Sequence, residues 1–410
     1  MPLSAELTDN IIDLIDDFHT LKNCSLVSKA WRPRSQYRLF GTLALLSPPA
    51  RSDLGSSSVK PEQVLKYALD FIEIANASWT LSSAVRKLAI PFDAVCQIGD
   101  SLAFPFRNLQ TLEIVLVMEE RAREELARNM NKVQLDSKGR TVQQATPGLV
   151  PLSVFQQNRS LRTLKLTNML IDESLMRSMF DGLGAGHEHS LLSSLEFESC
   201  AFGGIPAELV SRELYHAKFQ KLSLIFDETF HKNFLVERFD ISGVHSLSTD
   251  TPSCPVIRKF GTQMQSLTFY GTGIIDEDLH DDRPWLELKS LTHLHLVCPE
   301  YVDSFTSRLL LFFSILCTLI TPEFHNSIPL QVVSVSYGFL PVNSLADMLL
   351  CRLARSWQSL REIAIIHVPH NSRKFVEETL VDTLETGLLK IETESEVEMD
   401  SNAEEVYSAT

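Results

Sequence analysis

The residues of this 410-residue chain that could do chemistry are scattered, and the histidines are the first to consider. His293 and His295 alternate within an apolar run, so both imidazoles would share one face of a β-strand. Two nitrogen ligands without a nearby carboxylate or thiolate make a weak metal site. His187 and His189 stand in the segment GAGHEH, which a solvated loop explains as well as a ligand pair does. We therefore expect no bound metal.

Known catalytic and nucleotide-binding motifs are missing from the sequence. No GxGxxG, P-loop, GxSxG or HExxH sequence occurs. We accordingly predict no catalytic residue and no cofactor. An enzyme whose residues follow none of these motifs remains an alternative, and it rests only on scattered His and Asp.

The seven cysteines are widely spaced and form no CxxC pair. With an odd number of them and no secretory signal after Met1, we expect reduced core thiols rather than zinc ligands or disulfides. The longest apolar run, Leu309 to Ile320, is shorter than the roughly 20 residues that span a membrane, and it predicts a buried helix. These features predict a cytoplasmic or nuclear protein without a membrane partner.

The charge balance argues against a nucleic-acid partner. The chain has 37 Lys and Arg against 52 Asp and Glu, a formal net charge of −15, and no basic stripe. Affinity for phosphates depends on clustered Lys and Arg that release counterions. The composition is globular, with 44% hydrophobic and 22% charged residues. Abundant leucine with only 16 glycines indicates stacked repeats with few tight turns.

The first forty residues predict three short helices. Apolar side chains in residues 3–15 follow the spacing of one helix face, and Ser4 is the expected N-cap. Thr20 is the expected cap of the second helix, and Pro33 should restart the chain for the third. Helices this small cannot bury their own apolar stripes without a partner surface or the rest of the chain.

Charges in this segment are segregated along the sequence. Every ionised residue from Glu6 to Asp17 is acidic, and every one from Lys22 to Arg38 is basic. Each helix could simply present a solvated face, or the resulting dipole could orient a docking partner.

The same segment resembles the F-box motif, in which LPxEL precedes a branched aliphatic pair and a VSKxW ending. The resemblance covers Pro2 to Phe40 and is especially close to F-box proteins of basidiomycete fungi, where a leucine-rich region follows. Ser4 stands where the family usually has proline. The residues that match in order and spacing are Leu3, Glu6, Leu7, Ile11, Ile12, Leu21, Cys24, Leu26, Val27, Ser28, Lys29 and Trp31.

This resemblance implies docking on a Skp-family adaptor, which links an F-box protein to a cullin scaffold and to ubiquitin transfer. A partner with an apolar groove recognises an amphipathic helix by the apolar side chains spaced along one of its faces. The alternative is that these side chains pack only against the repeats that follow. The expected adaptor-docking residues are Leu3, Leu7, Ile11, Ile12, Leu26, Val27 and Trp31.

A six-residue pattern, apolar-x-x-apolar-x-apolar, recurs after the N-terminal segment. Several steps between instances are about 24 to 31 residues, close to the period of leucine-rich repeats, and longer gaps should hold insertions or a missed repeat. Helical signatures at 61–75, 172–183, 343–353 and 372–384 lie between them, and the one at 343–353 is expected to carry Leu345, Met348, Leu349 and Leu353 on its apolar face. The instances are Phe40–Leu45, Val85–Ile90, Leu109–Ile114, Leu161–Leu166, Leu192–Phe197, Phe219–Leu224, Met264–Phe269, Leu291–Leu296, Leu330–Val335 and Leu360–Ile365.

The predicted fold is therefore α/β, with three domains. A three-helix F-box over residues 1–40 precedes an irregular leucine-rich-repeat solenoid over 41–389, with parallel strands on the concave face and helices on the convex face. Irregular convex turns are expected because only Cys200 fills the small polar position after the last apolar residue. A polar insertion at 118–151 interrupts the solenoid, and 390–410 is an expected acidic, disordered tail.

Binding is expected on the concave face. The third and fifth residues of each pattern should point there, while the apolar ones point into the core. The side chains at these positions in successive patterns include both charge signs and hydroxyls, which favours a peptide or protein ligand. The sequence thus predicts a substrate adaptor of an SCF-type ubiquitin ligase that acts by proximity, or else an interaction scaffold without a ubiquitin role. The candidate substrate-binding residues are Thr111, Glu113, Thr163, Lys165, Glu196, Lys221, Thr268, His293 and His295.

Overall fold

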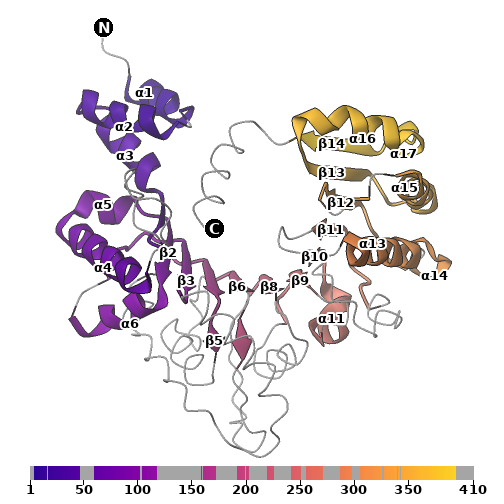
Figure 1. Cartoon of the computed structure of the whole chain (residues 1–410), viewed down its shortest axis with the longest axis horizontal. Helices are drawn as coiled ribbons and strands as arrows, with labels where there is room; N and C mark the ends of the chain where they lie inside the picture. Colours follow the sequence, from indigo (N-terminus) through magenta and orange to yellow (C-terminus); the bar gives the residue numbers. More distant parts are fainter. Residues whose placement is uncertain are drawn as a thin grey trace, which may run out of the picture. The chain divides into compact units, whose positions relative to one another are not determined.

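The computed structural model places helices and parallel strands in two compact units, Met1–Ala217 and Lys218–Thr410 (Figure 1). This arrangement confirms the predicted α/β class. The structure describes residues 4–15, 17–46, 60–101, 104–117, 158, 160–171, 192–198, 200–202, 219–225, 242–250, 255–270, 287–297, 305–325, 327–338, 340–341 and 343–393. The predicted insertion at 118–151 and the predicted helix at 172–183 lie outside these residues.

The first unit begins with three helices, α1 (Ala5–Asp13), α2 (Phe18–Val27) and α3 (Arg32–Phe40). The Ser4 hydroxyl accepts a hydrogen bond from the Leu7 amide at 3.2 Å, which confirms Ser4 as the N-cap. The predicted cap of the second helix is wrong. Asp17 caps α2 and accepts from the Thr20 amide at 2.5 Å, because a carboxylate at a helix N-terminus is the stronger acceptor.

Five parallel strands of the first unit lie side by side in chain order within its described residues. A helix pair, α4 (Pro61–Ala77) and α5 (Trp79–Ala84), precedes the second strand, and α6 (Phe92–Ser101) follows it. Two shorter strands, β5 (Leu170–Ile171) and β7 (Ala201–Phe202), pair separately. The five are β1 (Thr42–Ala44), β2 (Lys87–Pro91), β3 (Thr111–Val115), β4 (Thr163–Thr167) and β6 (Ser194–Glu198).

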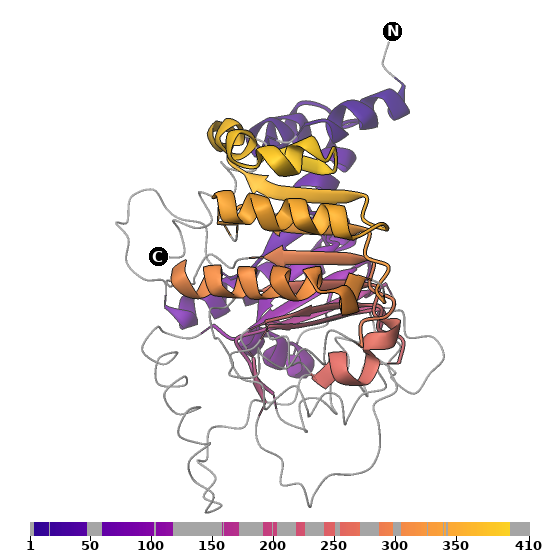
Figure 2. The same ribbon diagram turned by 90° about the vertical axis from the view of Figure 1, so that its right-hand side faces the viewer.

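The second unit also combines parallel strands with helices. Figure 2 shows α13, α15 and α16 stacked on one side of the strands. The parallel strands, in order, are β8 (Lys221–Ile225), β9 (Ser246–Thr249), β10 (Ser266–Tyr270), β11 (His293–Val297), β12 (Val332–Ser336), β13 (Glu362–Val368) and β14 (Leu389–Thr393). The helices are α11 (Pro255–Phe260), η2 (Gly261–Gln263), α13 (Phe305–Ile320), α14 (Pro322–His325), α15 (Ser344–Ser356), η4 (His370–Ser372), α16 (Arg373–Thr379) and α17 (Val381–Glu385).

All ten instances of the six-residue pattern contain a strand, and each strand begins at the third residue of its pattern. In the pattern that contains β3, all three apolar residues, Leu109, Leu112 and Ile114, are buried. Successive repeats are also joined through the second residue: the Gln110 carbonyl accepts from the amides of Arg162 at 2.8 Å and Thr163 at 2.9 Å. The apolar pattern therefore fixed both strand position and facing direction.

Strands β9 and β14 were not predicted. Val244, just before β9, and Leu247 within it occupy two inward positions, but the third is Thr249, a polar residue that is nevertheless fully buried. The pattern had therefore missed a repeat between Phe219 and Met264. Strand β14 extends to Thr393, so the predicted start of a disordered tail at 390 is wrong, because Leu389 and Ile391 alternate and pair with β13.

Helix positions in the second unit largely match their predictions, but some facing directions do not. Asn343 caps α15 by accepting from the Ala346 amide at 2.9 Å. Leu345 and Met348, expected on its apolar face, are exposed, and Ala346 and Leu350 are buried instead. The long run predicts a helix within 309–320, and α13 confirms it with buried Ile315, Leu316 and Leu319. In the part of the chain that is described, no helix has the length and apolarity to cross a bilayer.

The segment predicted as one helix over 372–384 is divided into α16 and α17. The carboxylate of Asp347 accepts from the amides of Asp382 at 3.0 Å and Thr383 at 2.8 Å, and from the Thr383 hydroxyl at 2.7 Å. A buried carboxylate with these partners caps the start of α17 from a neighbouring helix. This long-range cap restarts the helix, which a local pattern does not reveal.

Candidate functional site

The N-terminal helices expose an unusual number of large apolar side chains. Leu26 and Val27 at the end of α2 are 70% and 77% exposed, and Leu14 directly after α1 is 83% exposed. Leu7 and Ile11 on α1 are exposed to a lesser degree. We call these five residues the N-terminal apolar surface. Such a concentration of solvent-exposed leucine, isoleucine and valine in a small element is typical of a protein-binding surface.

The predicted docking residues divide into three groups. Leu7, Ile11, Leu26 and Val27 belong to the N-terminal apolar surface. Ile12 does not, since it is fully buried with Leu21 and Cys24 in the core of this segment, and its assignment as a docking residue is corrected. Trp31 is partly buried at the N-cap of α3, and Leu3 lies outside the described residues.

Leu14 was missed as a docking residue, although its signal was present in the sequence. It follows Leu7 by seven residues, which places both on the same helical face, and it follows Ile11 by three. The F-box resemblance did not select it because its pattern names the branched pair before it. Spacing alone would have added this residue.

The segregated charges of this segment meet across α1 and α3. Arg34 Nε donates to Asp13 Oδ1 at 2.7 Å, and a second bond joins the guanidinium to Oδ2. Arg38 Nη2 donates to the Ile15 carbonyl at 3.0 Å. The hydrogen bonds from Arg34 hold the pKa of Asp13 below its usual range. Charges from the acidic and basic stretches thus join α1 to α3. The sequence had left open whether these charges are solvated or orient a docking partner.

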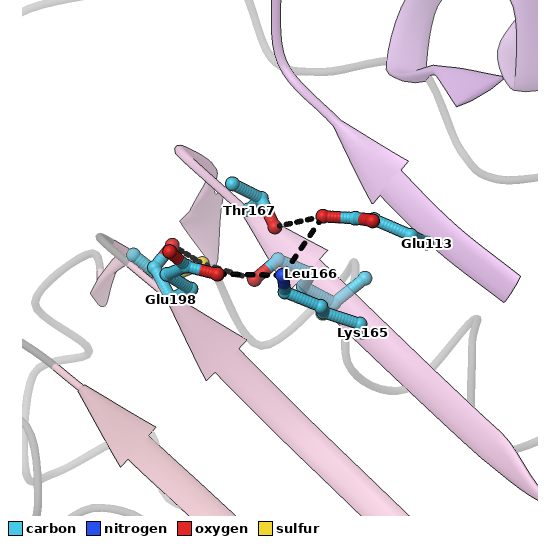
Figure 3. A network of polar contacts seen from close by, with 6 residues as sticks. Glu113, Lys165, Leu166, Thr167 and Glu198 are labelled. Carbon is cyan, nitrogen blue, oxygen red and sulfur yellow. Dashed lines mark hydrogen bonds and ion pairs between the residues drawn. The ribbon is translucent and has the colours of Figure 1, made fainter. Parts of the chain in front are cut away.

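A different kind of surface lies on the strands of the first unit. In Figure 3, Lys165 on β4 points between Glu113 of β3 and Glu198 of β6. Lys165 Nζ lies 3.1 Å from Glu113 Oε1 and 2.6 Å from Glu198 Oε2, and Thr167 Oγ1 donates to Glu113 Oε1 at 3.0 Å. We call these four residues the strand-face ion network.

Lys165 stays protonated in this network. Burial alone would lower the pKa of its ammonium group, but the bonds to Glu198 and Glu113 outweigh burial and raise the pKa. Thr111, Thr163 and Glu196 share this face and are half-buried, and Ser194 Oγ donates to Glu196 Oε1 at 3.0 Å. Candidate substrate residues from three successive repeats therefore lie together, as the pattern predicts.

The strand face of the second unit is less charged. Lys221 and His293 are exposed, and Thr268 and His295 are half-buried. Thr292 Oγ1 lies 2.8 Å from His293 Nδ1. Burial, together with the neighbouring His293, lowers the pKa of His295. Within the described residues no cluster of three His, Cys, Asp or Glu side chains could hold a metal ion.

Within the described residues no cysteine forms a disulfide, and three of the five described, Cys24, Cys200 and Cys351, are buried. Cys200 is buried, with Sγ 3.2 Å from the Leu166 carbonyl oxygen and 3.4 Å from that of Glu198, and burial raises the pKa of its thiol to about 12. It thus occupies the small polar position of its repeat, where its thiol contacts carbonyl oxygens of β4 and β6. Cys317 is exposed, which corrects its assignment as a core thiol.

Comparison with known proteins adds no identification, since no family model and no curated protein matches this chain.

Proposed function

We propose that this protein is the substrate-recognition subunit of an SCF-type cullin ubiquitin ligase. In this proposal the N-terminal helices are an F-box that docks on a Skp-family adaptor, and the following repeats are an irregular leucine-rich-repeat solenoid that binds a protein substrate. The protein supplies proximity, holding a substrate lysine near the ubiquitin carrier so that transfer becomes effectively intramolecular. Partner proteins perform the chemistry.

The N-terminal apolar surface is the observation that carries the docking proposal. Full burial of a leucine, isoleucine or valine side chain contributes roughly 1.5 to 3 kcal/mol, so several together can support a stable complex. Leu26 and Val27 are adjacent on α2, with exposed Lys22 and Lys29 near them in sequence. This arrangement suits an apolar groove with an acidic border.

The strand faces support the substrate-binding half of the proposal. Their ion pairs and hydroxyls are fixed by neighbouring strands, so they present a preorganised polar surface to a peptide or folded protein. The same face would serve a scaffold without a ubiquitin role. That alternative lacks a use for the N-terminal apolar surface, and we therefore rank it second.

Co-purification of the full-length chain with a Skp-family adaptor tests the docking proposal. We expect a complex with the wild-type chain and at least a tenfold loss of affinity for Leu26→Asp and for Val27→Asp, because each places a charge in an apolar contact. Leu345→Asp on α15 is the matched control, since Leu345 is an exposed leucine on a helix far along the chain.

Equal binding of the Leu26→Asp and Leu345→Asp variants would contradict the assignment of the docking surface. No adaptor binding by the wild-type chain would favour the scaffold alternative. Affinity capture with the wild-type chain, compared with Lys165→Glu, would then identify substrates that contact the strand-face ion network.

A further inference from the structure

The last strand of the second unit, β14, has one unpaired edge among the described residues. It pairs with β13 in parallel, and the Leu388 carbonyl accepts from the Ile363 amide at 2.9 Å. Because backbone groups alternate along a strand, the N–H and C=O groups of Leu389, Ile391 and Thr393 point away from β13. An edge of this kind is a template for pairing with another strand.

The side chains at this end of the unit also remain incompletely covered. Inward residues of β13 such as Ile363 and Ile365 are fully buried, whereas Leu389 and Ile391 in the same positions of β14 are only half-buried. Val381 and Leu384 on α17 are each 45% exposed. Repeat arrays ordinarily end in a polar capping repeat. This end instead presents apolar side chains beside an open strand edge.

The charges on β14 indicate what the edge fits. Lys390 and Glu392 lie two residues apart on the face opposite the inward residues, and both are exposed. Lys390 Nζ lies 2.5 Å from Glu392 Oε1 in the same strand and 3.8 Å from Glu362 Oε1 of β13. In an antiparallel pair of two β14 strands centred on Ile391, each Lys390 stands opposite the Glu392 of the other copy. The same register pairs Ile391 with Ile391 and Leu389 with Thr393, the residues whose backbone groups point outward. Hydrogen bonding and charge are thus satisfied by one two-fold arrangement.

We propose that two copies of this chain associate through β14 in an antiparallel, two-fold symmetric pair. A two-fold contact closes on itself, whereas a head-to-tail array would need a free edge at β1. Strand β1 has only three residues and contacts α3, so it offers a poor partner. Val381, Leu384, Leu389 and Ile391 would lose exposure in the pair, which supplies an apolar contribution beside the backbone hydrogen bonds.

Sedimentation and light scattering of the full-length chain test the proposal. We expect a species near twice the 46.2 kDa chain mass to form between about 1 and 100 μM, the range appropriate to a small interface. Lys390→Glu and Glu392→Lys each convert two attractive pairs into two repulsive ones, so each variant alone should associate roughly tenfold more weakly or worse. Circular dichroism of each variant confirms that it folds.

Mixing the two variants gives the decisive result. In a pair of one Lys390→Glu chain and one Glu392→Lys chain, opposite charges face each other at both positions. An equimolar mixture should therefore dimerise more tightly than either variant alone. The double variant Lys390→Glu/Glu392→Lys should dimerise by itself for the same reason. A monomeric wild-type chain, or a mixture no more associated than its components, would overturn the proposal. Dimerisation that appears only after deletion of residues 395–410 would instead show that the chain's own end covers the edge.

Discussion

The N-terminal helices and the strand repeats use the same residue types in opposite ways. On α1 and α2, leucine, isoleucine and valine face solvent, while an ion pair between Asp13 and Arg34 joins α1 to α3. On strands β3, β4 and β6, leucine and isoleucine are buried, and the ion pairs of Lys165 lie on the accessible strand face. The first surface offers a partner mainly desolvation, and the second offers directed polar contacts. Burial, and not residue type, thus distinguishes leucines that stabilise the fold from leucines available for binding.

Substitution of one leucine of each kind tests this distinction and should give the largest difference in stability. Leu164→Ala on β4 should lower the free energy of unfolding by about 2 to 5 kcal/mol, because Leu164 is fully buried and leaves a cavity. Leu26→Ala should change it by no more than about 0.5 kcal/mol. Urea denaturation followed by circular dichroism measures both, and equal losses would mean that Leu26 is buried in solution.

The strand-face ion network should have an intermediate effect. Lys165→Met leaves Glu113 and Glu198 without their shared cation, and we expect a loss of about 1 kcal/mol after allowing for partial exposure. Adding Glu198→Gln should recover part of that loss, because one of the two like charges is then removed. A double-mutant cycle in urea gives the coupling. Strict additivity of the two substitutions would show that the pair contributes nothing.

His295 should make stability depend on pH. Its folded pKa lies below the ordinary 6.5, so between the two values the unfolded chain binds more protons and stability rises with pH. The melting temperature of the wild-type chain should therefore decrease as pH falls through 6.5 towards the lower folded pKa. His295→Gln should flatten this dependence, and His367→Gln on β13 serves as a histidine control. Parallel curves for wild type and His295→Gln would contradict the assignment.

The smallest expected effect concerns Asp13 and Arg34. Since the folded pKa of Asp13 is lowered, its contribution is present above the unfolded value of 3.8 and is lost as pH falls through the folded value. Asp13→Asn should thus reduce stability slightly at neutral pH and not at all in strong acid. Thermal unfolding in low and high salt provides the measurement, because salt screens this partly exposed pair. A loss that persists in strong acid would point to helix capping or packing instead.

Strand positions were the part of the fold most readily predicted from sequence. Alternation has a period of two, so a correct apolar pattern fixes the position and the facing direction of a strand together. Strand β9 escaped prediction because Thr249 fills an inward position whose burial depends on neighbouring repeats. The division between α16 and α17 escaped because Asp347, 35 residues before Asp382 in sequence, supplies the cap.

The candidate sites were predicted in type and only partly in membership. Helical spacing and the F-box resemblance both led to α1 and α2, but the resemblance takes adjacent Ile11 and Ile12 as one aliphatic pair and so did not separate them. Their 39% and 0% exposures are set by tertiary packing in this segment, where α3 contacts both α1 and α2. On the strand face, the pattern selected Glu113 and Lys165 but not Glu198, which lies one position beyond the pattern and completes the network.

The sequence by itself determined the α/β class, the ten patterned strands, and an N-terminal segment richer in apolar residues than three short helices can bury. These properties are local, because periodicity and helix capping act over a few residues. Contacts in the folded chain select which isoleucine is exposed, which glutamates share Lys165, and that β14 is an edge strand among the described residues. Those outcomes depend on contacts between residues far apart in the chain, where packing and hydrogen bonding select among faces that the local pattern leaves equivalent.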